Sequence, residues 1–272
     1  PALKHKKLLT FAGKLHINNF SCIMANVIKI KKGLDINLKG KASDVLLNGG
    51  KSDSYAIVPD YYNGIVPKVV AKVGEKVKAG SVLMIDKNRP EIKFVSPVSG
   101  EVTAVNRGEK RKVLSVVVKP EAQIEYEDFG KKNVASLKRE EVKEAILHAG
   151  MWPFIKQRPY DIVASPADEP RDIFVSAFYS APLAPNFDFI VKGQEADFQA
   201  GLDALAKLTD GKVYVGIRKG SSVSVKGVET VEVEGPHPAA NVGVQINHIK
   251  PINKGEVVWT VNPADVIVIG RL

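Results

Sequence analysis

The chain has 272 residues, 44% of them apolar and 25% charged, and carries a formal net charge of +9 at pH 7. This length suits one large or two medium domains with a substantial core, and the composition is that of an ordinary globular protein. The single cysteine, Cys22, excludes a disulfide framework, a cysteine-ligated iron–sulfur cluster and a structural cysteine zinc site within the chain. No apolar run reaches the roughly 18 residues that a membrane-spanning helix needs. We therefore expect an intracellular protein that meets a membrane only through a partner or through its surface.

The positive charge is spread along the chain. Residues 1–23 carry four lysines and no acidic residue, whereas the later basic residues are interspersed with acidic ones and form no stripe with aromatic side chains. This distribution favours a mildly basic face toward an anionic membrane or an acidic partner over nucleic-acid binding. Because a clean strand begins only after Met24, we expect residues 1–23 to be an extension outside the fold. A basic arm that touches a membrane is the alternative.

Residues 24–125 are predicted to form a β domain that includes an N-terminal strand at Val27–Ile30. From Tyr55 onward this region consists of short β-branched runs separated by glycine and proline, which is typical of strands and turns. The strand candidates are residues 69–71, 82–85, 92–95 and 113–118. The segments that follow Gly64 and Gly100 have similar sequences. This internal repeat predicts a small β-sandwich or barrel of two interlocked halves.

This β pattern resembles the biotinyl/lipoyl carrier fold, in which a modified lysine stands at a hairpin tip eight residues before a proline. The proline that matches the carrier motif is Pro97, and eight residues before it is Arg89, which cannot form the required amide. Lys87 and Lys93 stand ten and four residues before Pro97. This spacing favours a carrier fold kept for its shape, with a biotin- or lipoyl-type carrier as the weaker alternative.

Residues 126–234 are predicted to form a Rossmann-like α/β domain. A helix is expected at Leu137–Ala149, where apolar residues recur on one face. Later apolar runs are typical of buried strands, at residues 161–165, 172–178, 187–191, 212–217 and 228–233. A second helix, expected within Gly193–Thr209, separates two of these runs, so a right-handed βαβ unit is predicted there.

Residues 235–272 return to short strands and turns, and we expect them to form a β-rich continuation of the domain. The chain stops directly after the apolar run Val266–Ile269. We therefore expect a C-terminally truncated chain, whose natural protein continues beyond Leu272.

Motifs that carry chemistry are weak in this sequence, and we predict no catalytic residue and no metal ligand. The glycine pattern G-x-G-x-x-G of dinucleotide-binding folds follows none of the predicted strands. The turn Arg218–Ser221 suits an anion, although a plain turn is the better interpretation. His237 and His248 have no carboxylate or thiol close in sequence and make a poor metal site.

An aromatic and cationic corner lies between the first helix and the next strand of the α/β domain. It contains Trp152, Phe154 and Arg158. Such side chains suit the wall of an apolar ligand pocket, and we take them as the candidate ligand-binding or quinone-side residues. Packing in the core or at an interface is the better interpretation for all three.

Several segments of the sequence, in the same order along the chain, resemble one family, the A subunit of the bacterial Na+-translocating NADH:quinone oxidoreductase. They are residues 28–35, 150–160, 172–178, 181–185, 235–239 and 258–262. The resemblance implies a peripheral subunit on the cytoplasmic face of the bacterial inner membrane, attached chiefly to a membrane-embedded B subunit. It also implies a complex that uses flavins and iron–sulfur centres to oxidise NADH, reduce ubiquinone and export Na+.

The same resemblance implies kinship with the flavin-binding subunit of respiratory complex I and with the C subunit of the Rnf complex. Those relatives carry a glycine-rich flavin loop after a helix such as Leu137–Ala149, but here Met151 and Trp152 stand in that loop. We therefore expect the chain itself to hold no flavin or iron–sulfur centre and to serve docking, quinone-site formation or both. An NADH- or flavin-binding oxidoreductase module with a degenerate loop is the alternative.

Overall fold

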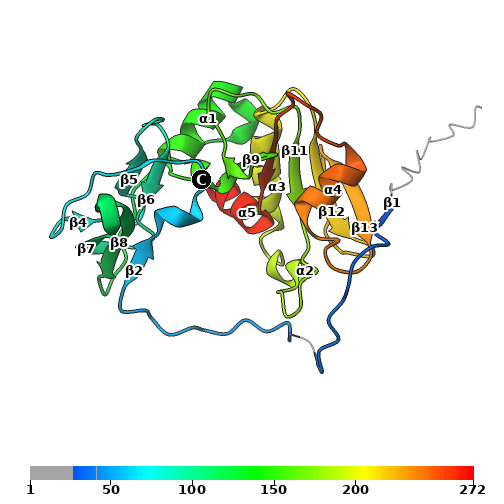
Figure 1. The fold of residues 1–272 in the computed structure, drawn as a ribbon, viewed down its shortest axis with the longest axis horizontal. Coiled ribbons are helices and arrows are strands. Elements are labelled where there is room, and N and C mark those ends of the chain that lie inside the picture. Colours follow the sequence, from blue (N-terminus) through cyan, green and yellow to red (C-terminus); the bar gives the residue numbers. More distant parts are fainter. Residues whose placement is uncertain (1–26, 41) are drawn as a thin grey trace, which may run out of the picture.

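The computed structural model describes residues 27–40 and 42–272, so the predicted extension at residues 1–23 lies outside the described residues. The described chain forms a β module followed by an α/β domain (Figure 1). This confirms the predicted fold class, a barrel-sandwich module joined to a Rossmann-like domain.

The β module consists of two small sheets whose neighbouring strands are all antiparallel. One sheet has four strands in the order β2-β8-β7-β4, and the other has three in the order β3-β5-β6. The strands are β2 (Tyr55–Ile57), β3 (Pro67–Val69), β4 (Lys76–Val77), β5 (Val82–Asp86), β6 (Lys93–Val95), β7 (Gly100–Arg107) and β8 (Val113–Pro120). Leu83, Val102, Val116 and Val118 are fully buried between the sheets. The module therefore has an apolar core of its own.

The α/β domain is built on a seven-stranded sheet with the order β1-β13-β12-β11-β14-β9-β10. Five strands are parallel, and β9 and β10 complete one edge in antiparallel pairing. The strands are β1 (Val27–Lys29), β9 (Ile155–Arg158), β10 (Ile162–Val163), β11 (Ile173–Ser176), β12 (Val213–Arg218), β13 (Glu229–Glu234) and β14 (Val258–Val261). All residues of β11 and β14 are buried, as expected for central strands covered on both faces.

Helices cover both faces of this sheet. They are α1 (Arg139–His148), α2 (Phe187–Ile190), α3 (Glu195–Lys207), α4 (Val242–Ile249) and α5 (Pro263–Arg271). Alternate residues of β11 point to opposite faces, so Val175 packs in the cluster that contains α3 and α5, whereas Phe174 packs with Ile246 of α4. The domain is therefore layered as helix, sheet and helix.

The first strand differs from its expected place. We expected it in the β module, but β1 pairs in parallel with β13, and Ile28 and Ile30 pack against Val231 and Val233. In Figure 1 it lies at the far edge of the large sheet, and the segment after it runs back beneath the molecule to β2. Strand propensity reveals that a segment is extended, but it does not identify the strand with which the segment pairs.

Two further expectations differ from the structure for one physical reason. The expected strand at residues 187–191 is α2, and the expected β-rich segment 235–272 contains α4 and α5 around the single strand β14. Each of these helices begins with an asparagine whose side chain accepts a hydrogen bond from a backbone N–H two residues later: Asn186, Asn241 and Asn262. These N-caps stabilise helix starts that the apolar runs alone do not reveal.

The β module is joined firmly to the α/β domain through its carrier-like hairpin. Arg89 donates from Nε to the buried Asp86 carboxylate at 2.8 Å, from Nη1 to the Val163 carbonyl at 3.2 Å and from Nη2 to the Gly64 carbonyl at 3.0 Å. Phe94 of the same hairpin belongs to the core cluster of the α/β domain. The hairpin that presents the modified lysine in carriers is here a docking contact within the chain.

Candidate functional site

A cleft opens at the carboxyl ends of β11 and β14, where the strand order of the large sheet reverses. From β11 the chain builds outward to β12 and β13, and it then returns through α4 to place β14 on the other side of β11. Ligands of open α/β sheets bind at such switch points, because the diverging connections leave a crevice there. The cleft has a volume of about 260 Å³. It is the natural candidate for a functional site.

One side of the cleft is cationic and comes from β9. Lys156 and Arg158 are two residues apart on this strand, so both side chains point to the same face and line the cleft. Burial lowers the pKa of Lys156, and the carboxylates of Asp161 and Asp265 oppose that shift. Arg158 is paired through Nε with Asp161 at 3.4 Å. The cleft thus holds two donors whose hydration is reduced.

An acidic group enters the cleft from α5. Asp265 lies in the first turn of this helix, and burial raises the pKa of its carboxyl to about 6, with Lys156 opposing the shift. A carboxyl with this pKa changes its protonation state close to neutral pH, and such groups cluster at functional sites.

Neutral polar groups complete the site. The Tyr179 hydroxyl donates to Asn262 Oδ1 at 3.2 Å, and the same oxygen caps α5 by accepting from the Ala264 N–H at 3.0 Å. Burial raises the pKa of Tyr179 above its ordinary value, and the nearby Asp265 carboxylate adds to the effect. Tyr179 therefore stays neutral at physiological pH and remains a hydrogen-bonding group beside the two cations.

An apolar groove lies next to this cleft, between the two parts of the chain. It has a volume of about 310 Å³ and is lined by Ile57, Tyr62 and Phe94 from the β module and by Met151, Phe154 and Val268 from the α/β domain. Phe154 also lines the cleft, so the two spaces adjoin. Lys156 Nζ lies 5.2 Å from the centre of the Tyr62 ring, which places the β module beside the cationic wall.

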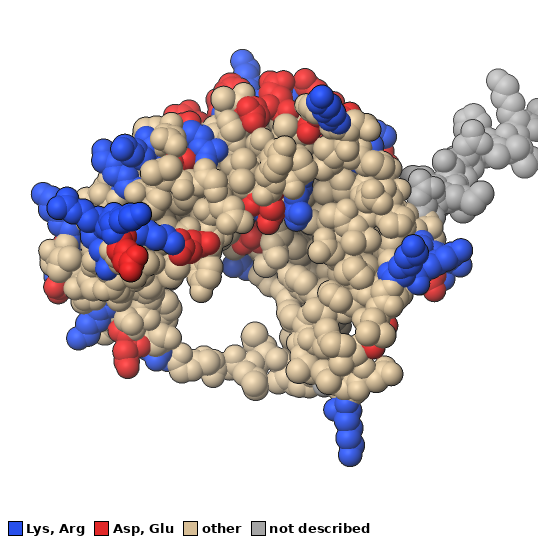
Figure 2. All heavy atoms as spheres, viewed as in Figure 1, with Lys and Arg blue, Asp and Glu red and all other residues tan. Residues whose placement is uncertain are grey.

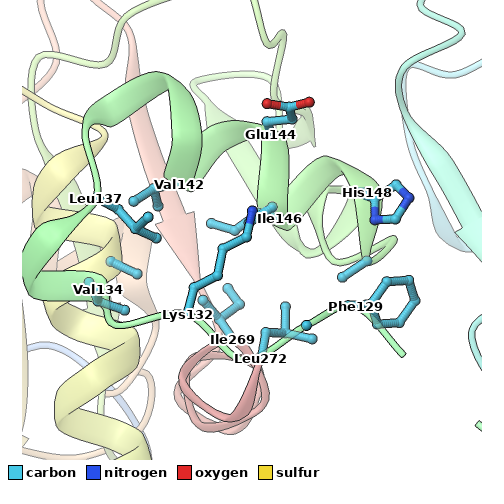
Figure 3. A pocket seen from close by; sticks show the side chains of 14 residues that line it. Phe129, Lys132, Val134, Leu137, Val142, Glu144, Ile146, His148, Ile269 and Leu272 are labelled. Carbon is cyan, nitrogen blue, oxygen red and sulfur yellow. The ribbon is translucent and has the colours of Figure 1, made fainter. Parts of the chain in front are cut away.

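A separate cavity of about 230 Å³ lies between α1, α5 and the segment that precedes α1 (Figure 3). Its lining is mostly apolar, with Leu137, Ile146 and Ile269 among the residues shown. Lys132 reaches across it, whereas the Glu144 carboxylate points away from it (Figure 3). Because polar groups do not converge there, this cavity offers apolar contact and lacks the chemistry of the cleft.

Only two of the three predicted site residues lie in the cleft. Phe154 and Arg158 line the cleft, but Trp152 is fully buried, donates from Nε1 to the Ala164 carbonyl at 2.9 Å and packs edge-to-face on Trp259. Trp152 therefore contributes to the core behind the site.

Most residues of the cleft were not predicted from the sequence, among them Lys156, Tyr179, Asn262 and Asp265. Tyr179 directly follows a run that was predicted as a buried strand, so its place at a carboxyl end was an available signal. Asp265 had no such signal, because its segment was expected to be β-rich and not the first turn of a helix.

The other chemical candidates are engaged elsewhere. Arg218 donates to the Tyr179 carbonyl at 2.9 Å, and Lys219 pairs with Glu234 at 3.0 Å. His237 Nδ1 is 3.0 Å from Ser180 Oγ, and His248 Nδ1 is 2.8 Å from the Val244 carbonyl oxygen. Among the described residues, no three His, Cys, Asp or Glu side chains gather in a way that suits a metal ion. Within the same residues, no helix is both long and apolar enough to cross a membrane.

Charged side chains lie mainly toward the margins of the face seen in Figure 2, whose centre is tan. Lys and Arg gather over the β module on the left, with some Asp and Glu among them, and Asp and Glu gather at the top.

Comparisons with known proteins identify both parts of the chain. Residues 28–121 match the family model of the NqrA N-terminal barrel-sandwich hybrid domain, and residues 137–272 match that of the NqrA second alpha/beta domain. The chain is 38% identical over 251 residues to the A subunit of the Na(+)-translocating NADH-quinone reductase from Neisseria meningitidis serogroup A, a match that covers 90% of this chain and 56% of that protein. It is 39% identical, with the same coverage, to the corresponding proteins of Vibrio atlanticus and Hahella chejuensis.

The chain spans little more than half the length of these relatives, 56% in each of the three. The match at residues 28–121 covers the β module together with most of β1, and the match at residues 137–272 covers the remainder of the large sheet and its helices. The chain therefore belongs to the NqrA family.

Proposed function

We propose that this chain acts as a peripheral subunit of a Na+-translocating NADH-quinone reductase and that its cleft receives the head group of a quinone. The relatives' name supplies the activity and the substrate class. The observation that carries the proposal for this chain is the cleft at the switch point, with cationic donors and aromatic walls beside an apolar groove.

The chemistry of a quinone suits this arrangement. Its ring is flat and has apolar faces, and its two carbonyl oxygens accept hydrogen bonds but donate none. Phe154 and Phe178 offer aromatic surface in the cleft, and Lys156 and Arg158 offer N–H donors. An isoprenoid chain has only apolar surface to bury, and the groove next to Phe154 provides it.

We further propose that the β module serves docking to the membrane-embedded part of the complex on its cytoplasmic face. A swinging carrier arm needs a free hairpin tip, whereas Arg89 holds this hairpin against the carbonyls of Val163 and Gly64. A module fixed in this way suits a rigid assembly contact.

We propose that this chain itself holds no flavin or iron–sulfur centre. The loop after α1, where flavin-binding relatives carry glycines, is covered here by the β module. A Cβ atom on Gly150 would lie 2.5 Å from Val95 Cγ1, and Trp152 beside it is fully buried. This close packing leaves the loop little room for a phosphate-bearing cofactor.

Photolabelling of the assembled complex with a photoreactive short-chain ubiquinone tests the quinone site. We expect labelled peptides from β9 and from the first turn of α5, with labelling suppressed by unmodified ubiquinone and by Lys156→Ala. The matched control Lys132→Ala alters the cavity of Figure 3 and leaves labelling unchanged. Labels confined to other subunits would contradict the quinone-site proposal and leave docking as the chain's role. Flavin retained by the purified chain would favour an NADH- or flavin-binding module, and added mass on Lys87 or Lys93 would favour a carrier.

A further inference from the structure

Asp265 is a partly buried acid in a cleft that also holds a partly buried base, Lys156. Among the described residues, no hydrogen bond or ion pair within 4.0 Å joins the two groups, although they shift each other's pKa. Charged groups that are withdrawn from water and serve only stability are normally paired directly. Because both groups line the cleft, a molecule bound there meets an acid and a base that the protein has left apart.

The groups around Asp265 come from three other elements. Lys156 and Arg158 lie on β9, with Asp161 just after that strand, and Tyr179 follows β11. Tyr62 of the β module also lies close, because the Asp265 carboxylate adds to the raised pKa of that tyrosine. Within the described part of the chain, none of the residues that line the cleft is a histidine. Of these groups, only Asp265 has a pKa shifted to about 6.

Resting on the proposed quinone site, we infer that Asp265 makes the cleft distinguish a quinone from its reduced quinol by switching between hydrogen-bond donor and acceptor. The ring oxygens of a quinone only accept hydrogen bonds, so the Asp265 carboxyl can bond to them only in its protonated form, as a donor. The hydroxyl groups of a quinol also donate, and an ionised carboxylate is the stronger acceptor for them. Lys156 donates to a ring oxygen in either case, which makes Asp265 the group that discriminates.

The direction of the pH dependence follows from this exchange. Below the pKa of Asp265, about 6, the carboxyl is neutral and favours the quinone; above it, the carboxylate favours the quinol. By linkage, bound quinone raises this pKa and bound quinol lowers it. Near neutral pH the carboxylate form prevails, so the affinity for the quinol, relative to that for the quinone, is higher there than at pH 5.

Equilibrium binding to the purified chain tests the inference without turnover. A ubiquinone with a single isoprenoid unit and its quinol are titrated at about pH 5 and about pH 8 by calorimetry. We expect quinone affinity to fall by about threefold to tenfold between these pH values, and quinol affinity to rise by a similar factor. In Asp265→Asn both pH dependences disappear. The matched control Asp161→Asn keeps them, because that carboxylate is half exposed and already paired with Arg158.

The binding results test the role of Asp265 separately from the existence of the quinone site. Binding of both ligands with no pH dependence, or with the same dependence in Asp265→Asn, overturns the role of Asp265 and leaves the quinone site standing. If neither the quinone nor the quinol binds, and circular dichroism shows that the chain is folded, then both the role of Asp265 and the proposed quinone site are overturned. Because Asn has nearly the shape of Asp and the N-cap of α5 is Asn262, which the substitution leaves intact, Asp265→Asn is expected to keep the fold that this comparison requires.

Discussion

At the scale of single residues, two side chains show how position decides chemistry. Arg89 stands where carriers of this fold present a modifiable lysine, yet its guanidinium is committed to Asp86 and to two backbone carbonyls. Asp265 is an ordinary carboxyl by type, but burial within the cleft raises its pKa to about 6. In both residues the surroundings, more than the residue type, determine what the side chain does.

We expect Arg89→Ala to lower the free energy of unfolding by about 3–5 kcal/mol, because it leaves the Asp86 carboxylate buried without its cation. Urea unfolding of both proteins measures this difference. Lys112→Ala removes an exposed ion pair of the same module, with Asp60, and serves as the control with a change within about 1 kcal/mol. Equal losses in the two variants would show that Arg89 is a surface residue in solution.

The raised pKa of Asp265 also predicts a pH-dependent stability. Between pH 3.8, the ordinary pKa of the carboxyl, and about pH 6, Asp265 is protonated in the folded state but ionised in the unfolded state. The free energy of unfolding therefore falls as pH rises through this window. We expect Asp265→Asn to be more stable than the parent by about 2 kcal/mol at pH 8, with the advantage shrinking toward pH 4. Urea unfolding at both pH values measures it. An advantage independent of pH would show that the carboxyl is not shifted.

At the scale of elements, α3 and α5 cross with their backbones in contact. A Cβ on Gly201 would lie 2.0 Å from the Val266 carbonyl oxygen, and one on Gly270 would lie 1.8 Å from the Asp197 carbonyl oxygen. The two glycines permit an approach that no other residue allows. This crossing holds α5 in place and, with it, the Asp265 end of the helix at the cleft.

Gly201→Ala is expected to destabilise the fold by about 1–3 kcal/mol, because the steric cost of separating α3 from α5 exceeds the gain in helix propensity of about 1 kcal/mol. Thermal unfolding followed by circular dichroism measures the change. Gly49→Ala has no atom within 4 Å of the added methyl group and is expected to leave the midpoint unchanged. A stabilised Gly201→Ala would show that the helices are not in backbone contact.

At the scale of the whole molecule, the two parts of the chain share a core. Met84, Ile92 and Phe94 of the β module are buried in the cluster that contains Trp152 and Ile155 of the α/β domain. The Phe94 ring also packs edge-to-face on Tyr62, with 4.8 Å between the ring centres. We therefore expect the β module and the α/β domain to unfold as one cooperative unit.

Phe94→Ala is expected to cost about 3–5 kcal/mol and to split the calorimetric unfolding transition into two, because it removes the largest module side chain from the shared core. Leu83→Ala is the control. This side chain is equally buried but belongs to the module's own core, so the variant is expected to be destabilised with a single transition. One transition in Phe94→Ala would contradict coupling through the shared core.

Much of the architecture was determined by the sequence itself. The strands at residues 82–85, 92–95 and 113–118, the helices α1 and α3 and the family were all predicted, because β-branched runs, helical periodicity and turn residues act locally. The helices α2, α4 and α5 were missed, since short apolar runs are compatible with either structure and an asparagine cap decides between them.

The tertiary structure alone decided the partner of β1, the docking of the hairpin through Arg89 and the composition of the cleft. Phe154 and Arg158 were expected at a site, but Tyr179 and Asp265 are 86 residues apart and meet there only because β14 returns to the side of β11 opposite β12. Pairing between distant strands depends on which apolar faces remain to be covered once the local elements exist. No local pattern contains that information, so the site emerges only when the sheet is assembled.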